Sequence, residues 1–134
     1  MNAGLAFAET QRARRDHGFL PPPLVMCKIP RWGGSRHLPA AERTVWAHYH
    51  VEGCDWWLTE LHQGTWTAYG AVNLGMDAGT EWAPFSLIEL ERVRADGRIV
   101  TNTDTGVMRR VPGLLIVNRD TRWEPRPWGE VDHP

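Results

Sequence analysis

Apolar and polar residues alternate along the chain from Thr44 onward, and this period of two predicts a half-buried strand. One row of the strand holds Val45, Ala47, Tyr49 and Val51, and the other holds Trp46, His48, His50 and Glu52. A turn at 52–55 leads to a second strand over 56–61. A glycine-containing connection at 62–65 leads to a third strand over 66–74. Three strands joined by short turns predict an antiparallel meander.

The apolar period then changes to that of a helix. Ser86 stands three residues before Glu89, the spacing of a reciprocal capping box that satisfies two backbone N–H groups at a helix start. Leu87 and Leu90 follow at helical spacing and form one apolar face. These signals predict a capped helix over residues 87–95.

Prolines and glycines divide the N-terminal part of the chain. Residues 1–19 are predicted as a polar lead-in with one short helix near 9–16. Proline is well tolerated in the first turn of a helix, so a second short helix is expected over 24–29. Residues 31–43 are predicted as a loop.

The C-terminal third predicts shorter elements. Residues 104–106 indicate a small hairpin, and the apolar run 114–117 is predicted as a buried strand that joins the sheet. The proline-rich tail from Glu124 is expected to be extended. We therefore expect one α+β domain over residues 20–134. It should hold an antiparallel sheet of three to four strands with the capped helix packed on one face.

Composition and charge limit the function classes. A chain of 134 residues fits one domain, and a net charge of −1 provides no global basic field for nucleic acid or membrane. No apolar run approaches the roughly 20 residues of a membrane-spanning helix. The N-terminus lacks the pattern of a secretory signal, so Cys27 and Cys54 are expected as reduced thiols. We expect a cytoplasmic protein that does not bind membranes.

Two histidines form the most enzyme-like feature. His48 and His50 lie two apart on one strand, so both imidazoles face the same side and could meet one metal ion. A third ligand would come from His62, Cys54, Asp55 or Glu60. The alternative is a polar sheet face that carries two histidines. The chain offers no second ligand pair at fixed spacing, so we expect no metal and no other cofactor.

Nucleophilic catalysis is not favoured by the sequence. The carboxylate of Asp55 beside Cys54 raises the pKa of a thiol, which opposes thiolate formation. Ser86 is explained as a helix cap. The stretch 33–35 lacks the following lysine and the preceding strand of a phosphate-binding loop. The chain is therefore expected not to be an enzyme.

Tryptophan and arginine are the notable residue types. The chain has eight tryptophans, and Lys28 is its only lysine. A GC-rich genome explains the arginine bias, and so does a surface that needs planar guanidinium groups. Single-stranded nucleic-acid binders stack bases on aromatic rings and track the backbone with cations. Such a surface would use Trp46, Trp57 and Trp66, with phosphate contacts from Arg109, Arg110, Arg119 and Arg122. The balanced charge opposes this hypothesis, and Trp56, Trp82 and Trp123 are better explained as packing residues.

Several segments together resemble a small bacterial family known as the domain of unknown function 2958 family. They are His48-Tyr49-His50 with Asp55-Trp56-Trp57-Leu58-Thr59-Glu60-Leu61, Tyr69-Gly70-Ala71-Val72-Asn73, Glu81-Trp82 with Phe85-Ser86-Leu87-Ile88-Glu89-Leu90-Glu91, and Val117-Asn118-Arg119-Asp120 with Trp123-Glu124-Pro125-Arg126-Pro127. Each motif is short, and their joint order over most of residues 20–131 carries the resemblance. The chain departs from the family pattern at Ala83-Pro84 and at Asn118.

The resemblance implies an accessory role, because this family is typical of plasmids, phages and integrative elements. It supplies no catalytic residue. Our first hypothesis is a non-enzymatic binding module of a mobile element that engages a protein partner, with inhibition of a host defence protein as one version. Single-stranded nucleic-acid binding is the second, and a metal-dependent enzyme at His48 and His50 is the third. The candidate binding residues are Trp46, His48, His50, Trp57, Trp66, Arg119 and Arg122.

Overall fold

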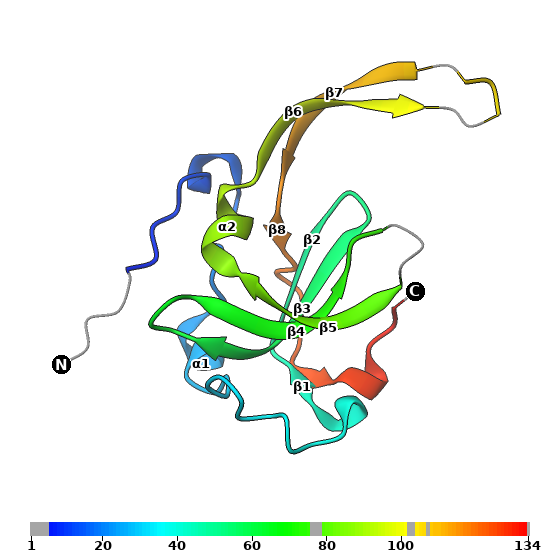
Figure 1. The fold of residues 1–134 in the computed structure, drawn as a ribbon. Helices are drawn as coiled ribbons and strands as arrows, with labels where there is room; N and C mark the ends of the chain where they lie inside the picture. The colour runs from blue at the N-terminus through cyan, green and yellow to red at the C-terminus, as the bar shows by residue number, and fades with distance from the viewer. Residues whose placement is uncertain (1–5, 76–78, 102–103, 107, 134) are drawn as a thin grey trace.

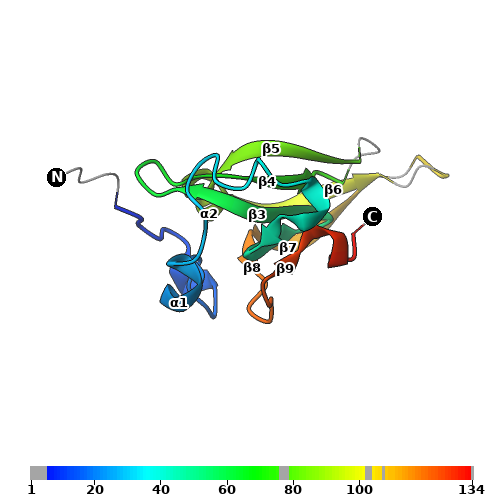
Figure 2. The same ribbon diagram turned by 90° about the horizontal axis from the view of Figure 1, so that it is seen from below.

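A five-stranded antiparallel sheet forms the centre of the protein, in the order β5-β4-β3-β2-β8. The structure is a computed structural model that describes residues 6–75, 79–101, 104–106 and 108–133, with the backbone alone described for 95–101 and 108–114. The strands of the sheet are β2 (Ala47–Val51), β3 (Cys54–His62), β4 (Thr67–Asn73), β5 (Thr80–Ser86) and β8 (Asn118–Arg119). Figure 2 shows β3, β4 and β5 side by side.

Two further strand pairs and several short helical segments flank this sheet. The pairs are β1 (Thr44–Val45) with β9 (Arg126–Pro127), and β6 (Arg94–Thr101) with β7 (Met108–Ile116). The helical segments are η1 (Arg12–Arg14), α1 (Pro23–Met26), η2 (Ala40–Glu42), α2 (Leu87–Arg92) and η3 (Trp128–Glu130). In Figure 1 the β6–β7 pair extends from the body as an arm, while β1 and the C-terminal segment lie below the sheet. Antiparallel sheets with short helices define an α+β protein.

The predicted meander is present as β2, β3 and β4, but the prediction of three to four strands is wrong. The segment 80–86, expected as the approach to the helix, pairs with β4 along its whole length as β5. β8 adds a fifth strand beside β2. Pro84 lies within the edge strand β5, where a residue without an N–H does not break an internal ladder.

The apolar run 114–117 was predicted to join the sheet, and this prediction is also wrong. Residues up to Ile116 pair with β6 in the arm, and only the two residues of β8 reach the sheet. A strand can satisfy its backbone groups with any neighbouring strand, so an apolar run does not determine its partner. The predicted helix 87–95 ends earlier, at Arg92, because Val93 is extended and β6 begins at Arg94.

The start of α2 follows from its cap. The Glu89 backbone N–H donates to Ser86 Oγ at 3.1 Å, which satisfies one of the free donors at the helix N-terminus. Leu87 and Leu90 are buried in the same core cluster as Tyr49. This cluster lies on the side of the sheet that α2 covers, which we call the helix-side face.

The opposite face of the sheet buries a second, smaller core. Its members are Val45, Trp57, Ala71, Trp128 and Val131. Successive side chains of a strand point to opposite faces, so the central strand β3 contributes to both cores. Every residue from Trp56 to Leu61 is buried.

An irregularity in β3 changes which side chains reach this second face. Leu58 pairs with Gly70 and Glu60 pairs with Tyr69, so Thr59 is an extra residue in β3. Such a bulge reverses the alternation beyond it. Glu60 therefore lies on the face of Tyr69, and Leu61 lies in the helix-side core. A Cβ at Gly70 would stand 1.8 Å from the Trp57 carbonyl oxygen, so this close approach requires glycine.

Candidate functional site

A continuous chain of ring contacts crosses the face of the sheet opposite α2. His48, Trp57, Ala71 and Trp82 occupy paired positions on β2, β3, β4 and β5, which places their side chains on one face. Adjacent ring centroids lie between 5.1 and 6.1 Å apart. The rings, in order of contact, are those of Trp32, Tyr69, Trp82, Trp128, Trp57, His48 and Trp123. We call this set the aromatic face.

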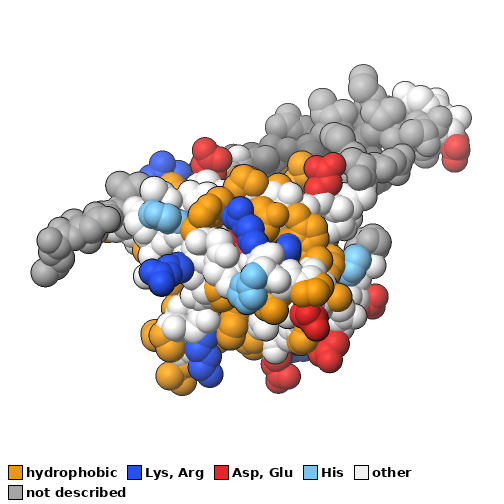
Figure 3. Space-filling model, turned by 60° about the horizontal axis from the view of Figure 1, so that its bottom comes forward, with side chains coloured by type: hydrophobic (Ala, Val, Ile, Leu, Met, Phe, Trp, Pro, Cys, Tyr) orange, Lys and Arg blue, Asp and Glu red, His pale blue; other side chains and the backbone are white. Residues whose placement is uncertain are grey.

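Guanidinium groups cover several of these rings. Arg36 lies 3.8 Å from the Tyr69 ring centroid and 4.7 Å from that of Trp32. Arg43 lies over Trp82 and Arg126 over Trp123, at 4.8 and 4.0 Å. Figure 3 is turned so that the bottom of the molecule in Figure 1 comes forward, and it shows Lys and Arg side chains set among hydrophobic ones. Cation–π contacts of this kind hold the guanidinium groups against the rings.

A buried carboxylate fixes the position of Arg36. Glu60 is fully buried and lies 3.3 Å from Arg36 Nε. The backbone N–H groups of Gly33 and Ser35 donate to its two oxygens at 2.6 and 3.1 Å, and the Ser35 hydroxyl donates as well. A buried charge is tolerated only when it is paired and hydrogen-bonded, and Glu60 meets both conditions. The β-bulge at Thr59 is what turns Glu60 toward this loop.

The arrangement leaves one edge of the Arg36 guanidinium available. Its Nε lies near Glu60, and its central carbon lies over the rings of Tyr69 and Trp32. Over the described ranges, no hydrogen bond to a protein atom involves its two terminal nitrogens. The side chain is 39% exposed. Arg36 can therefore donate two parallel hydrogen bonds to an acceptor that comes from solvent.

A groove lies beside Trp32. Its volume is about 530 Å³, and Ile29 and Leu61 provide apolar walls while Arg31 and His62 contribute polar groups. A second hollow of about 240 Å³ shares Trp32 and His62 with it. Trp32 is one of the exposed large apolar side chains, at 39% of its surface. Grooves of this size accommodate one or two side chains of a partner.

His48 forms the other end of the aromatic face. Its Nε2 lies 2.7 Å from Asp55 Oδ1, and its Nδ1 lies 3.5 Å from Asp120 Oδ2. The ring stacks on Trp57 with an interplanar angle of 9°. Burial lowers the pKa of the neighbouring His50, and the charge of His48 adds to this effect. Across the part of the chain that the structure describes, no three His, Cys, Asp or Glu side chains are grouped so that they could hold a metal ion.

The structure separates the residues that the sequence brought together as candidates. His48 and Trp57 belong to the aromatic face, and His50 is exposed next to them. Trp57 is only 3% exposed. Trp46 and Trp66 instead pack against the helix-side core, and Trp66 contacts the Phe7 ring edge-on.

The two candidate arginines also lie elsewhere. Arg119 pairs with Tyr49 in the sheet, and its Nε donates to the Gly18 carbonyl oxygen at 3.1 Å. Arg122 is exposed, and its backbone N–H donates to Asp120 Oδ1. Arg109 and Arg110 lie in the arm, where the structure describes the backbone alone. The predicted set therefore does not form one surface.

The sequence did not predict the centre of the site, which consists of Trp32, Arg36 and Tyr69 with Glu60 beneath. It indicated Glu60 only as a third metal ligand. One signal was present: Glu60 interrupts the run Trp56–Leu61, which is otherwise nearly all apolar. A carboxylate in such a strand needs a buried cation and hydrogen-bond donors.

No family model matches the chain, and no curated protein and no solved structure matches it. Within the described ranges, none of the helices has the length and apolar character needed to cross a membrane.

Proposed function

We propose that this chain is a non-enzymatic binding protein that engages another protein through the aromatic face and its arginines. The observation that carries the proposal is the position of Arg36 over the rings of Trp32 and Tyr69, with its Nε paired to Glu60. Tryptophan, tyrosine and arginine dominate the energetics of protein–protein interfaces. Both charge and shape at Arg36 are fixed before a partner arrives, which lowers the entropic cost of binding.

The resemblance to the domain of unknown function 2958 family supports an accessory role in a plasmid, phage or integrative element. Inhibition of a host defence protein is one form of that role. The site would then act in the cytoplasm by occupying a surface of its partner. It needs no metal or cofactor for this function.

Single-stranded nucleic-acid binding is the second candidate, since tryptophans do lie on a sheet face. Bases would need open ring faces on which to stack. Here Arg36, Arg43 and Arg126 lie over rings of the aromatic face, and His48 covers Trp57. We therefore expect intrinsic tryptophan fluorescence to stay unchanged when oligothymidylate is added at low salt. Saturable quenching that disappears at high salt would favour the nucleic-acid candidate instead.

A capture experiment tests the protein-binding proposal. The immobilised chain is exposed to a lysate of the source cells, in parallel with a Trp32→Ala/Arg36→Lys variant. Arg92→Gln serves as a control because Arg92 is an exposed arginine at the end of α2. We expect at least one protein to be retained by the unmodified chain and by Arg92→Gln, and to be lost from the double variant. Retention of the same proteins by all three, or of none, would contradict the proposal.

A further inference from the structure

The Arg36 guanidinium is held more firmly than an ordinary surface arginine. Glu60 pairs with its Nε, while the rings of Tyr69 and Trp32 contact the guanidinium group. The loop that carries it is itself tied to Glu60 through Gly33 and Ser35. The terminal nitrogens of a guanidinium held in this way make no hydrogen bond within the described ranges, and they match the geometry of a carboxylate, which accepts two parallel hydrogen bonds.

We infer that the aromatic face, together with the adjoining groove beside Trp32, binds a protein segment in which an Asp or Glu side chain lies next to a large apolar residue. The carboxylate accepts hydrogen bonds from the terminal nitrogens of Arg36. The apolar side chain enters the groove beside Trp32, against Ile29 and Leu61. This inference rests on the proposed function and specifies the chemistry of the partner.

Charge supports a carboxylate as the anion. The Glu60 charge already compensates that of Arg36 in an ion pair, and three donors disperse it: two backbone N–H groups and the Ser35 hydroxyl. A ligand with a single negative charge adds little repulsion to this pair. A phosphate carries up to two negative charges and would be repelled more strongly by Glu60. Arg31 in the groove and Arg43 over Trp82 add positive charge on either side.

The shape of the surface supports the apolar half of the segment. Trp32 lines both hollows, and the residue is more than one third exposed although it is large and apolar. Ile29 and Leu61 form apolar walls of the groove. An apolar side chain that enters the groove beside Trp32 would therefore leave water without breaking a hydrogen bond of these two side chains. A carboxylate next to an apolar anchor would therefore use both parts of the surface at once.

Selection from a displayed library of random peptides tests this inference. The folded chain is immobilised, and bound peptides are enriched over several rounds. We expect enriched sequences to share Asp or Glu next to Trp, Phe, Leu or Ile. One enriched peptide is then titrated by fluorescence anisotropy against the chain and its variants. Arg36→Lys, and the peptide with Gln or Asn in place of its acid, should each weaken binding by at least about tenfold.

Two further variants separate binding from folding. Arg36→Lys keeps a cation opposite Glu60, and thermal unfolding should show that it stays folded. Arg36→Gln with Glu60→Gln removes both charges, so no buried charge is left unpaired. Because the new amide would face the donors of Gly33 and Ser35, thermal unfolding first shows that this variant is folded at the assay temperature, and it should then lose peptide binding to the same extent. Arg92→Gln removes the same charge far from the face and should bind the peptide as the unmodified chain does.

The outcomes distinguish this inference from the proposed function. Enriched peptides without acidic residues that no longer bind Trp32→Ala would refute the carboxylate and leave a protein-binding face. Acidic peptides that bind Arg36→Lys as tightly as the unmodified chain would refute the role of Arg36. Absence of any enriched sequence would also overturn the inference, while the capture experiment decides the proposed function independently.

Discussion

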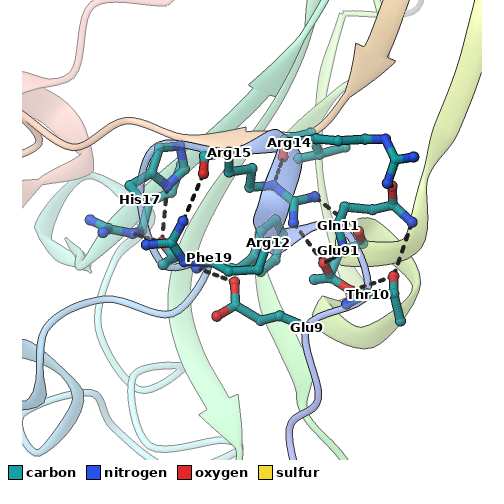
Figure 4. A network of polar contacts seen from close by, with 12 residues as sticks. Glu9, Thr10, Gln11, Arg12, Arg14, Arg15, His17, Phe19 and Glu91 are labelled. Carbon is teal, nitrogen blue, oxygen red and sulfur yellow. Dashed lines mark hydrogen bonds and ion pairs between the residues drawn. The ribbon is translucent and has the colours of Figure 1, made fainter.

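Replacing Glu91 by glutamine should destabilise the protein strongly, because this residue fastens the N-terminal segment to α2. The carboxylate is fully buried and lies 2.6 Å from Arg15 Nη1. Its oxygens also accept hydrogen bonds from the backbone N–H groups of Thr10 and Gln11, both at 2.8 Å, and from the Thr10 hydroxyl at 2.9 Å. Figure 4 shows these groups converging on Glu91.

The expected magnitude follows from what remains after the change. The amide introduced by Glu91→Gln would place N–H donors against donors already aimed at the site, and Arg15 would keep a fully buried charge without a counter-ion. Breaking a buried pair from one side costs about 3–5 kcal/mol. For a domain of this length the unfolding entropy converts that loss into a fall in melting temperature of about 10–18 °C.

Acidification should reduce the difference between the two proteins. Burial alone would raise the pKa of Glu91, but the hydrogen bonds from Thr10, Gln11 and Arg15 outweigh it and hold the pKa below its ordinary value of 4.5. The folded state therefore binds this proton less readily than the unfolded state. The stabilisation is fully present above the ordinary pKa and is lost as the pH falls through the lower folded pKa. Thermal unfolding of both proteins along a pH series measures the effect.

Two variants serve as references for this measurement. Glu81→Gln makes the same change at an exposed site of β5 and should alter stability by less than about 0.5 kcal/mol. Arg15→Met combined with Glu91→Leu removes both charges and should cost clearly less than the sum of the two single changes. A loss below about 1 kcal/mol for Glu91→Gln, or an additive double variant, would refute the importance of the ion pair.

Three further outcomes follow from the geometry. Gly70→Ala should lower the free energy of unfolding by at least about 3 kcal/mol in urea titrations, because its Cβ would stand 1.8 Å from the Trp57 carbonyl oxygen. An unchanged midpoint would contradict the tight bulge. Ser86→Ala should cost about 1 kcal/mol in the same assay, through loss of the cap, and Ser86→Gly less. Burial raises the pKa of the Cys54 thiol, as does Asp55, so iodoacetamide should alkylate it more slowly than glutathione at neutral pH. The rate is measured in a variant without the other cysteine, and equal rates would argue against the shift.

The site shows how far local patterns reach. Tryptophan and arginine were predicted to form the site, but Trp46 and Trp66 pack against the helix-side core, whereas Trp57 lies in the second core on the opposite face. Alternation within a strand predicts which side chains share a face only while the alternation is regular. The break between β1 and β2 precedes Ala47, and the bulge lies at Thr59, so the regular pattern fails at both places.

The sequence by itself determined the three central strands and the start of α2. Those features depend on periodicity and on a cap that spans only Ser86 to Glu89, so their causes lie within a few residues of one another. The tertiary structure alone decided that Glu60 meets Arg36 and that Glu91 meets Arg15. These partners lie 24 and 76 residues apart, and their contacts depend on strand register and on the path of loops. A buried charge in the sequence shows that a partner must exist, but only the folded chain determines which residue it is.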